Sequence, residues 1–234
     1  MKRILLKALS LLCMVLFPVF GLSQESLKIG GDWVNDPGTL QACPIGLFYK
    51  NSISQVVYTR EELSELSGNM ITALSYTLSS QPTKTFSKAI DVYIGKMVTD
   101  GFSEEKFIST EGMEKVATVI IGSFDSKTLT LPLDNPYLYD GNSNLIVSII
   151  KRDEPTYENC VFEGFNNGTS GDDIKRQCLF ACTDGSELAA EDISAVKLSD
   201  IASNKKGYGT VRPITTFVYE VQSENAVLKL MQKE

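Results

Sequence analysis

Hydrophobic and polar residues alternate with a period of two along much of this chain. The alternation is clearest in residues 70–78 and 89–94. Successive side chains of a β-strand point to opposite faces, so this pattern predicts strands with one buried and one solvated face. Residues 145–150 are instead almost wholly apolar, which predicts a strand buried on both faces. Segments rich in β-branched and aromatic residues complete the set of predicted strands: 45–49, 53–59, 116–121, 128–133, 159–165, 177–182 and 213–221.

Signals for helix are scarce. Thr59 is followed three residues later by Glu62, which is the spacing of a capping box and predicts a short helix near residues 60–66. Residues 223–233 fit either a short terminal helix or a last edge strand. Heptads and repeats of 20–50 residues are absent from the sequence. The predicted fold class is therefore all-β, a single antiparallel β-sandwich of roughly ten strands.

The first 23 residues have the three parts of an export signal. A basic start is followed by an uncharged apolar run over residues 8–22, and Gly21 and Ser23 place small residues before a cleavage point. A retained membrane anchor would need about 20 apolar residues, more than this run provides. A lipoprotein signal at Cys13 would need a small residue where Leu12 stands. We therefore expect cleavage after Ser23, with no membrane span afterwards.

The division of the chain follows from this signal. Residues 1–23 form the signal peptide, residues 24–221 form one β-sandwich domain, and residues 222–234 form a C-terminal tail. The expected location is outside the cytoplasm, in the periplasm, at the cell surface or secreted. Removing the signal takes away three basic residues, so the formal net charge falls from −7 to −10. This acidity argues against nucleic acid as a partner, because phosphates require a basic surface.

The sequence contains no histidine. A Ser-His-Asp or Cys-His nucleophile and a His-ligated zinc site are therefore excluded. Acidic residues that are neighbours in sequence lie in polar segments, without the burial that raises the pKa of a catalytic carboxylic acid. From these observations the protein is predicted not to be an enzyme. A glycoside hydrolase remains as an alternative, if two carboxylates from distant segments meet in the fold.

Four cysteines remain after cleavage of the signal, which in an exported chain predicts two disulfides. If residues 159–165 and 176–182 are the arms of a hairpin, Cys160 lies opposite Cys178. This pairing leaves Cys43 for Cys182. A bridge from Cys178 to Cys182 is disfavoured, because four residues of strand span about 13 Å and a disulfide joins Cα atoms about 4.4–6.8 Å apart.

Five segments, taken in their order along the chain, resemble a known module. They are 44–63 with Ser54-Gln-Val-Val-Tyr-Thr-Arg-Glu-Glu-Leu63, 68–76 with Gly68-Asn-Met-Ile-Thr, 90–95, 131–147 with Asp140-Gly-Asn-Ser-Asn144, and Arg212-Pro213. They resemble the exported β-sandwich accessory module of Bacteroidetes secreted and surface proteins, including adhesins and proteases. The resemblance covers about residues 41–220. It implies a jelly-roll-like fold without known chemistry of its own.

Asp140, Asn142 and Asn144 alternate side-chain oxygens as the first half of a calcium loop does. The rest of that loop is missing, because Lys151 stands where the bidentate glutamate belongs. A hairpin turn before the strand at residue 145 is the favoured interpretation, since Asp-Gly is a strong turn signal. Calcium at these three residues is the alternative, and no other cofactor is expected.

Two regions are candidates for ligand binding. Trp33 lies in a glycine-rich polar segment, where an exposed indole would stack on a sugar ring. The favoured alternative is that Trp33 packs the N-terminal segment onto the sandwich. The second region is the polar loop that contains Asn166, Asn167, Asp172 and Asp173. Such loops carry binding functions, although most are simple connections.

These observations predict an exported, non-catalytic binding module that acts in adhesion or captures a glycan or an envelope or host protein. Tyr, Asn, Ser and Gly are plentiful, and such residues on loops held by rigid sheets suffice for binding. The alternative is a structural subunit of an envelope assembly, which would dock through an exposed sheet edge or apolar patch.

Overall fold

The fold is taken from a computed structural model, which describes residues 23–80, 82, 88–122, 127–152, 157, 159–166 and 175–222. The signal peptide expected at 1–23, apart from Ser23, lies outside these residues, and so does the C-terminal tail from residue 223 onwards. Within the described residues, no helix combines the length and the hydrophobicity needed to cross a membrane.

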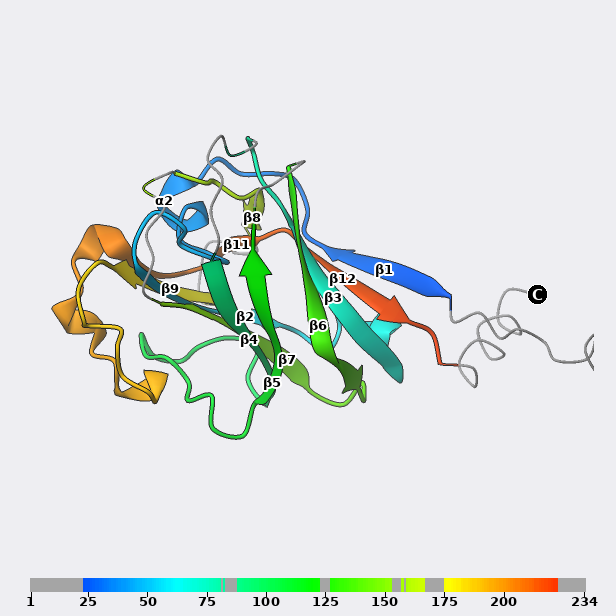
Figure 1. Cartoon of the computed structure of the whole chain (residues 1–234). Coiled ribbons are helices and arrows are strands. Elements are labelled where there is room, and N and C mark those ends of the chain that lie inside the picture. Colours follow the sequence, from blue (N-terminus) through cyan, green and yellow to red (C-terminus); the bar gives the residue numbers. More distant parts are fainter. Residues whose placement is uncertain are drawn as a thin grey trace, which may run out of the picture.

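The described residues contain twelve strands, which form three sheets (Figure 1). The strands are β1 (Gln24–Ile29), β2 (Asn51–Tyr58), β3 (Asn69–Thr77), β4 (Lys88–Met97), β5 (Glu114–Ile121), β6 (Thr128–Tyr139), β7 (Asn144–Lys151), β8 (Gly164–Asn166), β9 (Cys178–Thr183), β10 (Lys206–Gly209), β11 (Val211–Pro213) and β12 (Thr215–Glu220). The short helices are α2 (Pro37–Leu40) and the 3-10 turns η1 (Ser64–Leu66), η2 (Ile193–Ala195), η3 (Leu198–Asp200) and η4 (Ser203–Lys205).

Eight of these strands form the two facing sheets of a jelly roll. One sheet has the order β1-β12-β3-β6, and the other contains β2-β7-β4-β5. The paired strands are antiparallel throughout, and the chain crosses from one sheet to the other as a jelly roll requires. β9 and β10 extend the second sheet beyond β2, while β8 and β11 form a separate pair. The predicted all-β, jelly-roll-like sandwich is confirmed.

Apolar side chains of the two sheets meet between them and form the main core. Tyr58 of β2 packs edge-on against Phe217 of β12, with ring centroids 4.9 Å apart, and both are fully buried. The Tyr58 hydroxyl shares a 2.7 Å hydrogen bond with the Thr215 hydroxyl, so its polar atom is also satisfied. The core therefore joins β2 of the six-stranded sheet to β12 of the four-stranded sheet.

A second apolar cluster covers the outer face of the six-stranded sheet. Ile53, Val57 and Ile146 project from the sheet into this cluster, and the segments 98–113 and 186–205 lie over them (Figure 1). Every residue of β2, β7 and β9 is consequently buried. The prediction that residues 145–150 form a strand buried on both faces is confirmed, and the covering segments explain why.

The helix predicted near residues 60–66 is a turn followed by the single 3-10 turn η1. The capping-box contacts form as expected, since the Thr59 N–H donates to Glu62 Oε2 at 2.9 Å. Leu63 and Leu66 are both fully buried, and a spacing of three residues places two side chains on one side of a 3-10 turn. Residues 45–49 were predicted as a strand, but they form turns and bends after α2.

Two predicted hairpins are wrong. β8 pairs with β11, and β9 pairs with β2 and β10, so residues 159–165 and 177–182 do not pair with each other. The turn after Tyr139 joins β6 of one sheet to β7 of the other, so it is a crossing between sheets. In both cases the apolar strand pairs with a central strand of the six-stranded sheet, and every one of its residues is buried there.

Candidate functional site

Trp33 lies between β1 and α2, with 51% of its surface exposed. Half of the residue is therefore accessible, and the interpretation that Trp33 packs the N-terminal segment onto the sandwich stays a prediction. The neighbouring Val34 N–H donates to the Gly164 carbonyl at 2.9 Å, which fixes this segment beside β8. Asn166 is the exposed last residue of β8. Asn167, Asp172 and Asp173 lie outside the described residues.

Two of the three residues proposed for calcium, Asp140 and Asn144, use their side-chain oxygens in other contacts. Asp140 Oδ2 accepts from Lys96 Nζ at 2.6 Å and Oδ1 accepts from the Asn142 N–H at 2.9 Å, and these bonds lower the pKa of Asp140. The Asn144 amide bonds elsewhere, donating to the Thr99 carbonyl at 2.9 Å. Across the part of the chain that the structure describes, no group of three or more acidic or cysteine side chains is arranged to hold a metal ion.

The cysteines are arranged differently from the prediction, and the four described here form no disulfide. Cys178 Sγ lies 3.2 Å from Cys43 Sγ, beyond the roughly 2.05 Å of a disulfide bond. Cys160 precedes β8, which does not pair with β9, so the hairpin that was to oppose Cys160 and Cys178 is missing. Burial raises the pKa of Cys43, and it raises the pKa of Cys182 to about 12. These thiols are therefore poor nucleophiles at neutral pH.

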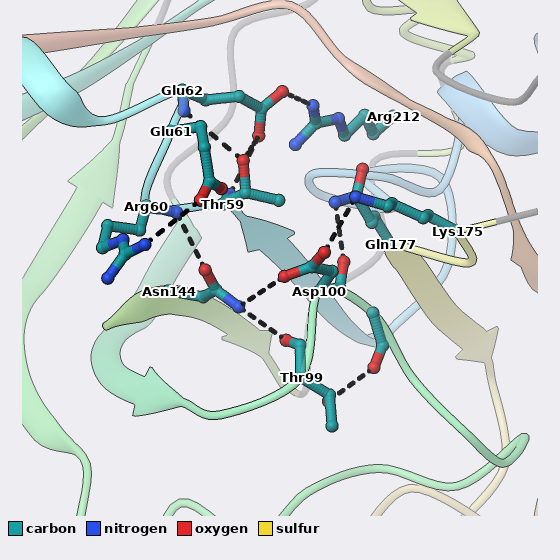
Figure 2. A network of polar contacts seen from close by, with 11 residues as sticks. Thr59, Arg60, Glu61, Glu62, Thr99, Asp100, Asn144, Lys175, Gln177 and Arg212 are labelled. Atoms are coloured by element: carbon teal, nitrogen blue, oxygen red, sulfur yellow. Dashed lines mark hydrogen bonds and ion pairs between the residues drawn. The ribbon is translucent and has the colours of Figure 1, made fainter. Parts of the chain in front are cut away.

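A buried arginine organises one end of the sandwich (Figure 2). Arg212 of β11 has no exposed surface, and its Nη1 donates to the Val57 carbonyl at 2.8 Å. Its Nη2 forms an ion pair with Glu62 in the turn after β2. The guanidinium also lies over two aromatic rings, 4.8 Å from the centroid of Phe165 and 5.4 Å from that of Tyr58. These contacts fasten β11 to β2 and to the turn that follows it.

The polar cluster continues from this turn to three more segments (Figure 2). Asn144 Oδ1 accepts from the Arg60 N–H at 2.8 Å, and its Nδ2 donates to Asp100 Oδ1 at 3.1 Å. Asp100 also pairs with Lys175 at 2.8 Å, and the hydrogen bonds from Lys175 and Asn144 lower its pKa. Gln177 is fully buried and donates to the Asp100 carbonyl at 2.7 Å. Arg212 Nε is the exception, being buried without a partner among the described residues, while the other groups named bond to one another and tie these loops together.

A separate hollow of about 280 Å³ lies on the outer face of the six-stranded sheet. β4 supplies alternate outward residues, β7 supplies Ile150, Arg152 follows directly after β7, and the covering segments complete the wall. We call it the Arg152 pocket, and its lining residues are Ala89, Asp91, Tyr93, Thr110, Ile150, Arg152 and Glu191. It therefore combines an aromatic ring, two carboxylates, a hydroxyl and a guanidinium.

Arg152 is held in this pocket by one hydrogen bond from Nη2 to the Ala190 carbonyl, at 2.8 Å. Its Nε is buried and has no hydrogen-bond partner within the described part of the chain. No carboxylate of the described residues forms an ion pair with Arg152. Asp91 is already engaged, since its Oδ1 lies 2.8 Å from Lys115 Nζ and accepts from the Thr118 hydroxyl at 2.8 Å. The pocket thus contains one cation with unused hydrogen-bonding capacity.

Two larger hollows, of about 460 and 610 Å³, adjoin each other in the covering segments. They share Glu104, Lys106 and Ser194, and the first includes Val98, which is 99% exposed. As far as the structure describes the chain, neither of them is lined by a buried polar atom that lacks a partner. The Arg152 pocket is therefore the better candidate site, although it is the smallest of the three.

The sequence did not indicate this pocket, because its two carboxylates lie 100 residues apart. The pairs of acidic residues that the sequence suggests as candidate catalytic carboxylates are instead adjacent in the chain. Asp91 and Tyr93 are on the outward face of β4, so the alternation of that strand placed them on a common surface. Nothing in the sequence indicated that Arg152 and Glu191 would join them there.

No protein-family model matches this chain, and no curated protein matches it. Among solved structures, the cysteine protease and lectin-like domains of Cwp84, a surface layer associated protein of Clostridium difficile, match with a TM-score of 0.39 and 9% identity, over 74% of this chain. A second structure of the clostridial cysteine protease Cwp84, after propeptide cleavage, matches with a TM-score of 0.41 and 8% identity, over 85% of this chain. The match spans only 33% and 40% of those two chains.

These matches correct one prediction. Both matched chains come from a cysteine protease, which contradicts the prediction that the protein is not an enzyme. We withdraw that prediction, and catalysis is considered below together with binding.

Proposed function

We propose that this protein is an exported carbohydrate-binding module and that the Arg152 pocket is its binding site. The observation that carries the proposal is the convergence of Tyr93, Asp91, Glu191 and Arg152 on one hollow of about 280 Å³. A sugar offers an apolar face and a ring of hydroxyls. A tyrosine ring packs against the face, while carboxylates accept hydrogen bonds from the hydroxyls and a guanidinium donates to them. The export signal predicted at residues 1–23 would bring this site to extracellular glycans.

The six-stranded sheet and the segments that cover it would together hold the site in place. Asp91 and Tyr93 lie on β4, between β5 and β7, so the sheet fixes them from both sides. Arg152 is tied to the carbonyl of Ala190, next to Glu191, which links the end of β7 to the cover. A site built on paired strands needs little ordering when a ligand binds. The small area available limits the affinity for a single sugar residue to roughly 1 mM, or about −4 kcal/mol.

The test is a glycan array with the purified protein, followed by titration calorimetry on each glycan bound. Tyr93→Ala should abolish measurable binding, because it removes the ring that would contact the sugar. Tyr157→Ala is the matched control, since Tyr157 is 56% exposed and does not line the pocket. A protein that retains its glycan affinity after Tyr93→Ala would contradict the proposal. A pull-down from the native envelope runs beside the array, and a protein partner without any glycan would favour the structural-subunit alternative.

Glycoside hydrolysis is the second candidate, and one observation favours it. Asp91 and Glu191 come from distant segments and line the same pocket, and most glycosidases act with two carboxyl groups. Each glycan bound on the array is therefore incubated with the protein and analysed for shorter products. Hydrolysis that is lost in Glu191→Gln while binding persists would establish the enzyme. Glu61→Gln is the control, because the Glu61 side chain is 70% exposed and lies outside the pocket.

A further inference from the structure

The geometry points to a more specific ligand for this pocket: a sugar residue that carries a carboxylate, such as a uronic acid of an anionic polysaccharide. This inference rests on the proposed carbohydrate-binding function and names the class of sugar. Two properties of Arg152 carry it, namely its charge, which no carboxylate of the described residues pairs with, and its buried Nε, which has no hydrogen-bond partner among them.

Within the described residues, Arg152 is the cation of the pocket that lacks a counter-ion. A guanidinium stays charged at all physiological pH values. Lys115, the neighbouring cation, is paired with Asp91 at 2.8 Å, and this contact raises the pKa of Lys115. Arg152 has no such carboxylate in the part of the chain that the structure describes. The two carboxylates and the two cations of this region balance one another in number, but Arg152 is the cation without an ion pair among the described residues and can therefore pair with an anion.

The buried Nε of Arg152 offers a mode of binding for that anion, which requires the side chain to shift because Nε has almost no exposed surface. A buried donor without a partner is uncommon in folded proteins, and a bound water or ion is one explanation. Arg212 Nε is a second such donor, but Arg212 does not line this pocket. Nη2 gives one of its two N–H groups to the Ala190 carbonyl, which holds the guanidinium plane. Its second N–H and the Nε–H can together bind the two oxygens of one carboxylate. A neutral sugar hydroxyl would use only one of these donors.

The remaining groups of the pocket suit the rest of such a sugar. Tyr93 and Thr110 are half-buried and offer a ring face and a hydroxyl. Glu191 is exposed, so water and salt screen its repulsion of an anion, and it remains an acceptor for sugar hydroxyls. The hollow is close to the lower limit of small-molecule sites, which are about 300–1,000 Å³, so it suits one residue of a longer chain.

The overall charge of the protein makes this inference easy to test. The chain carries a formal net charge of −7, so an anionic polysaccharide would not be attracted without a specific cation. Binding of the anion should depend on Arg152 and should weaken as salt is added. Binding of a neutral sugar should lose only the hydrogen bonds that Arg152 donates to its hydroxyls, and should not weaken as salt is added.

The experiment compares trigalacturonic acid with the same trisaccharide after reduction of its carboxyl groups, by calorimetry on the full protein. We expect the acid to bind about tenfold more tightly than its reduced form. Arg152→Gln should remove this preference, so that the acid and its reduced form bind with affinities within about twofold of each other. Arg152→Lys should restore part of the preference, because a lysine supplies the charge without the two-pronged geometry. Arg60→Gln is the control, since the Arg60 side chain is 59% exposed at the other cluster.

The outcomes separate the inference from the function on which it rests. Equal affinity for the acid and its reduced form would overturn the inference and leave carbohydrate binding intact. Absence of binding to every oligosaccharide on the array would overturn both. Tighter binding of a polyglutamate peptide than of the acid would also overturn the inference, and would indicate an acidic protein partner. Should Arg152→Gln fail to fold, Arg152→Lys and a salt titration of the wild-type protein test the same dependence.

Discussion

The ion pair between Glu62 and Arg212 allows a quantitative prediction about stability. Glu62→Gln removes the negative charge while preserving the size of the side chain and an oxygen for the Thr59 N–H. Arg212 is fully buried, whereas the Glu62 side chain is 23% exposed. Removing one partner of a fully buried pair costs about 3–5 kcal/mol, because the remaining charge is left without compensation. Arg212 would keep the Val57 carbonyl and two aromatic faces, so we expect a loss of about 2–3 kcal/mol.

Urea denaturation at pH 7 measures this loss. The midpoint should fall while the dependence of free energy on urea stays unchanged, because the same surface is exposed on unfolding. Glu61→Gln is the matched control from the next position. The Glu61 side chain is 70% exposed and lies 3.5 Å from Arg60, so its removal should cost no more than about 0.5 kcal/mol.

Two results would refute this reasoning. The first is a loss in Glu62→Gln that equals the loss in Glu61→Gln, which would mean that the buried charge of Arg212 needs no counter-ion. The second comes from the double variant Glu62→Gln with Arg212→Met. If the uncompensated charge is the cause, the double variant should be more stable than Glu62→Gln alone. A double variant that is less stable would assign the effect to lost packing instead.

Three further predictions concern export, acid stability and the thiols. Protein purified from its native host should lack residues 1–23, and intact mass measurement would contradict this if the full chain were found. In the folded protein the pKa of Asp100 is lowered, first of all by the hydrogen bond from Lys175. The ionised Asp100 side chain therefore stabilises the fold at pH values above its ordinary pKa of 3.8. This stabilisation is lost as the pH falls through the lower pKa of the folded state. Asp100→Asn should therefore flatten the stability profile below about pH 4 and leave its shape near neutrality unchanged, in denaturation curves measured across that range. Oxidation with a small-molecule disulfide, which is itself reduced to two thiols, should join Cys43 to Cys178. A non-reducing peptide map detects this bond. A map in which Cys178 is joined to any other cysteine would contradict the structure.

The alternation of polar and apolar residues determined much of the fold without tertiary information. It placed β3, β4 and β7 close to their observed bounds, and it identified β7 as buried on both faces. These properties are local, because the side chains of a strand alternate whatever the strand pairs with. The capping-box contact between Thr59 and Glu62 was predictable for the same reason, since its two residues are three positions apart.

The sequence did not reveal the short strands β1, β10 and β11. Each has few residues, and each is stabilised by a partner strand from a distant part of the chain. β1, for example, pairs with β12 at the far end of the domain, so its strand character depends on that partner. β9 and β12 are no longer than β1, but they are rich in β-branched, aromatic or apolar residues, whereas β1 is mostly polar and exposed.

Tertiary structure alone decided which distant residues meet. Alternation indicates which face of a strand is buried, but it does not indicate which strand lies beside it. Loop length does not decide this either, because the entropic cost of closing a loop grows only slowly with the length of the loop. A nearby hairpin between residues 159–165 and 177–182 therefore had little advantage over the pairing of β9 with β2, which buries β9 completely. The approach of Cys43 to Cys178, and of Arg152 to Asp91 and Glu191, followed from that choice of partners. Both clusters depend on how the sheets and their cover pack, which is a property of the whole folded chain and of none of its segments alone.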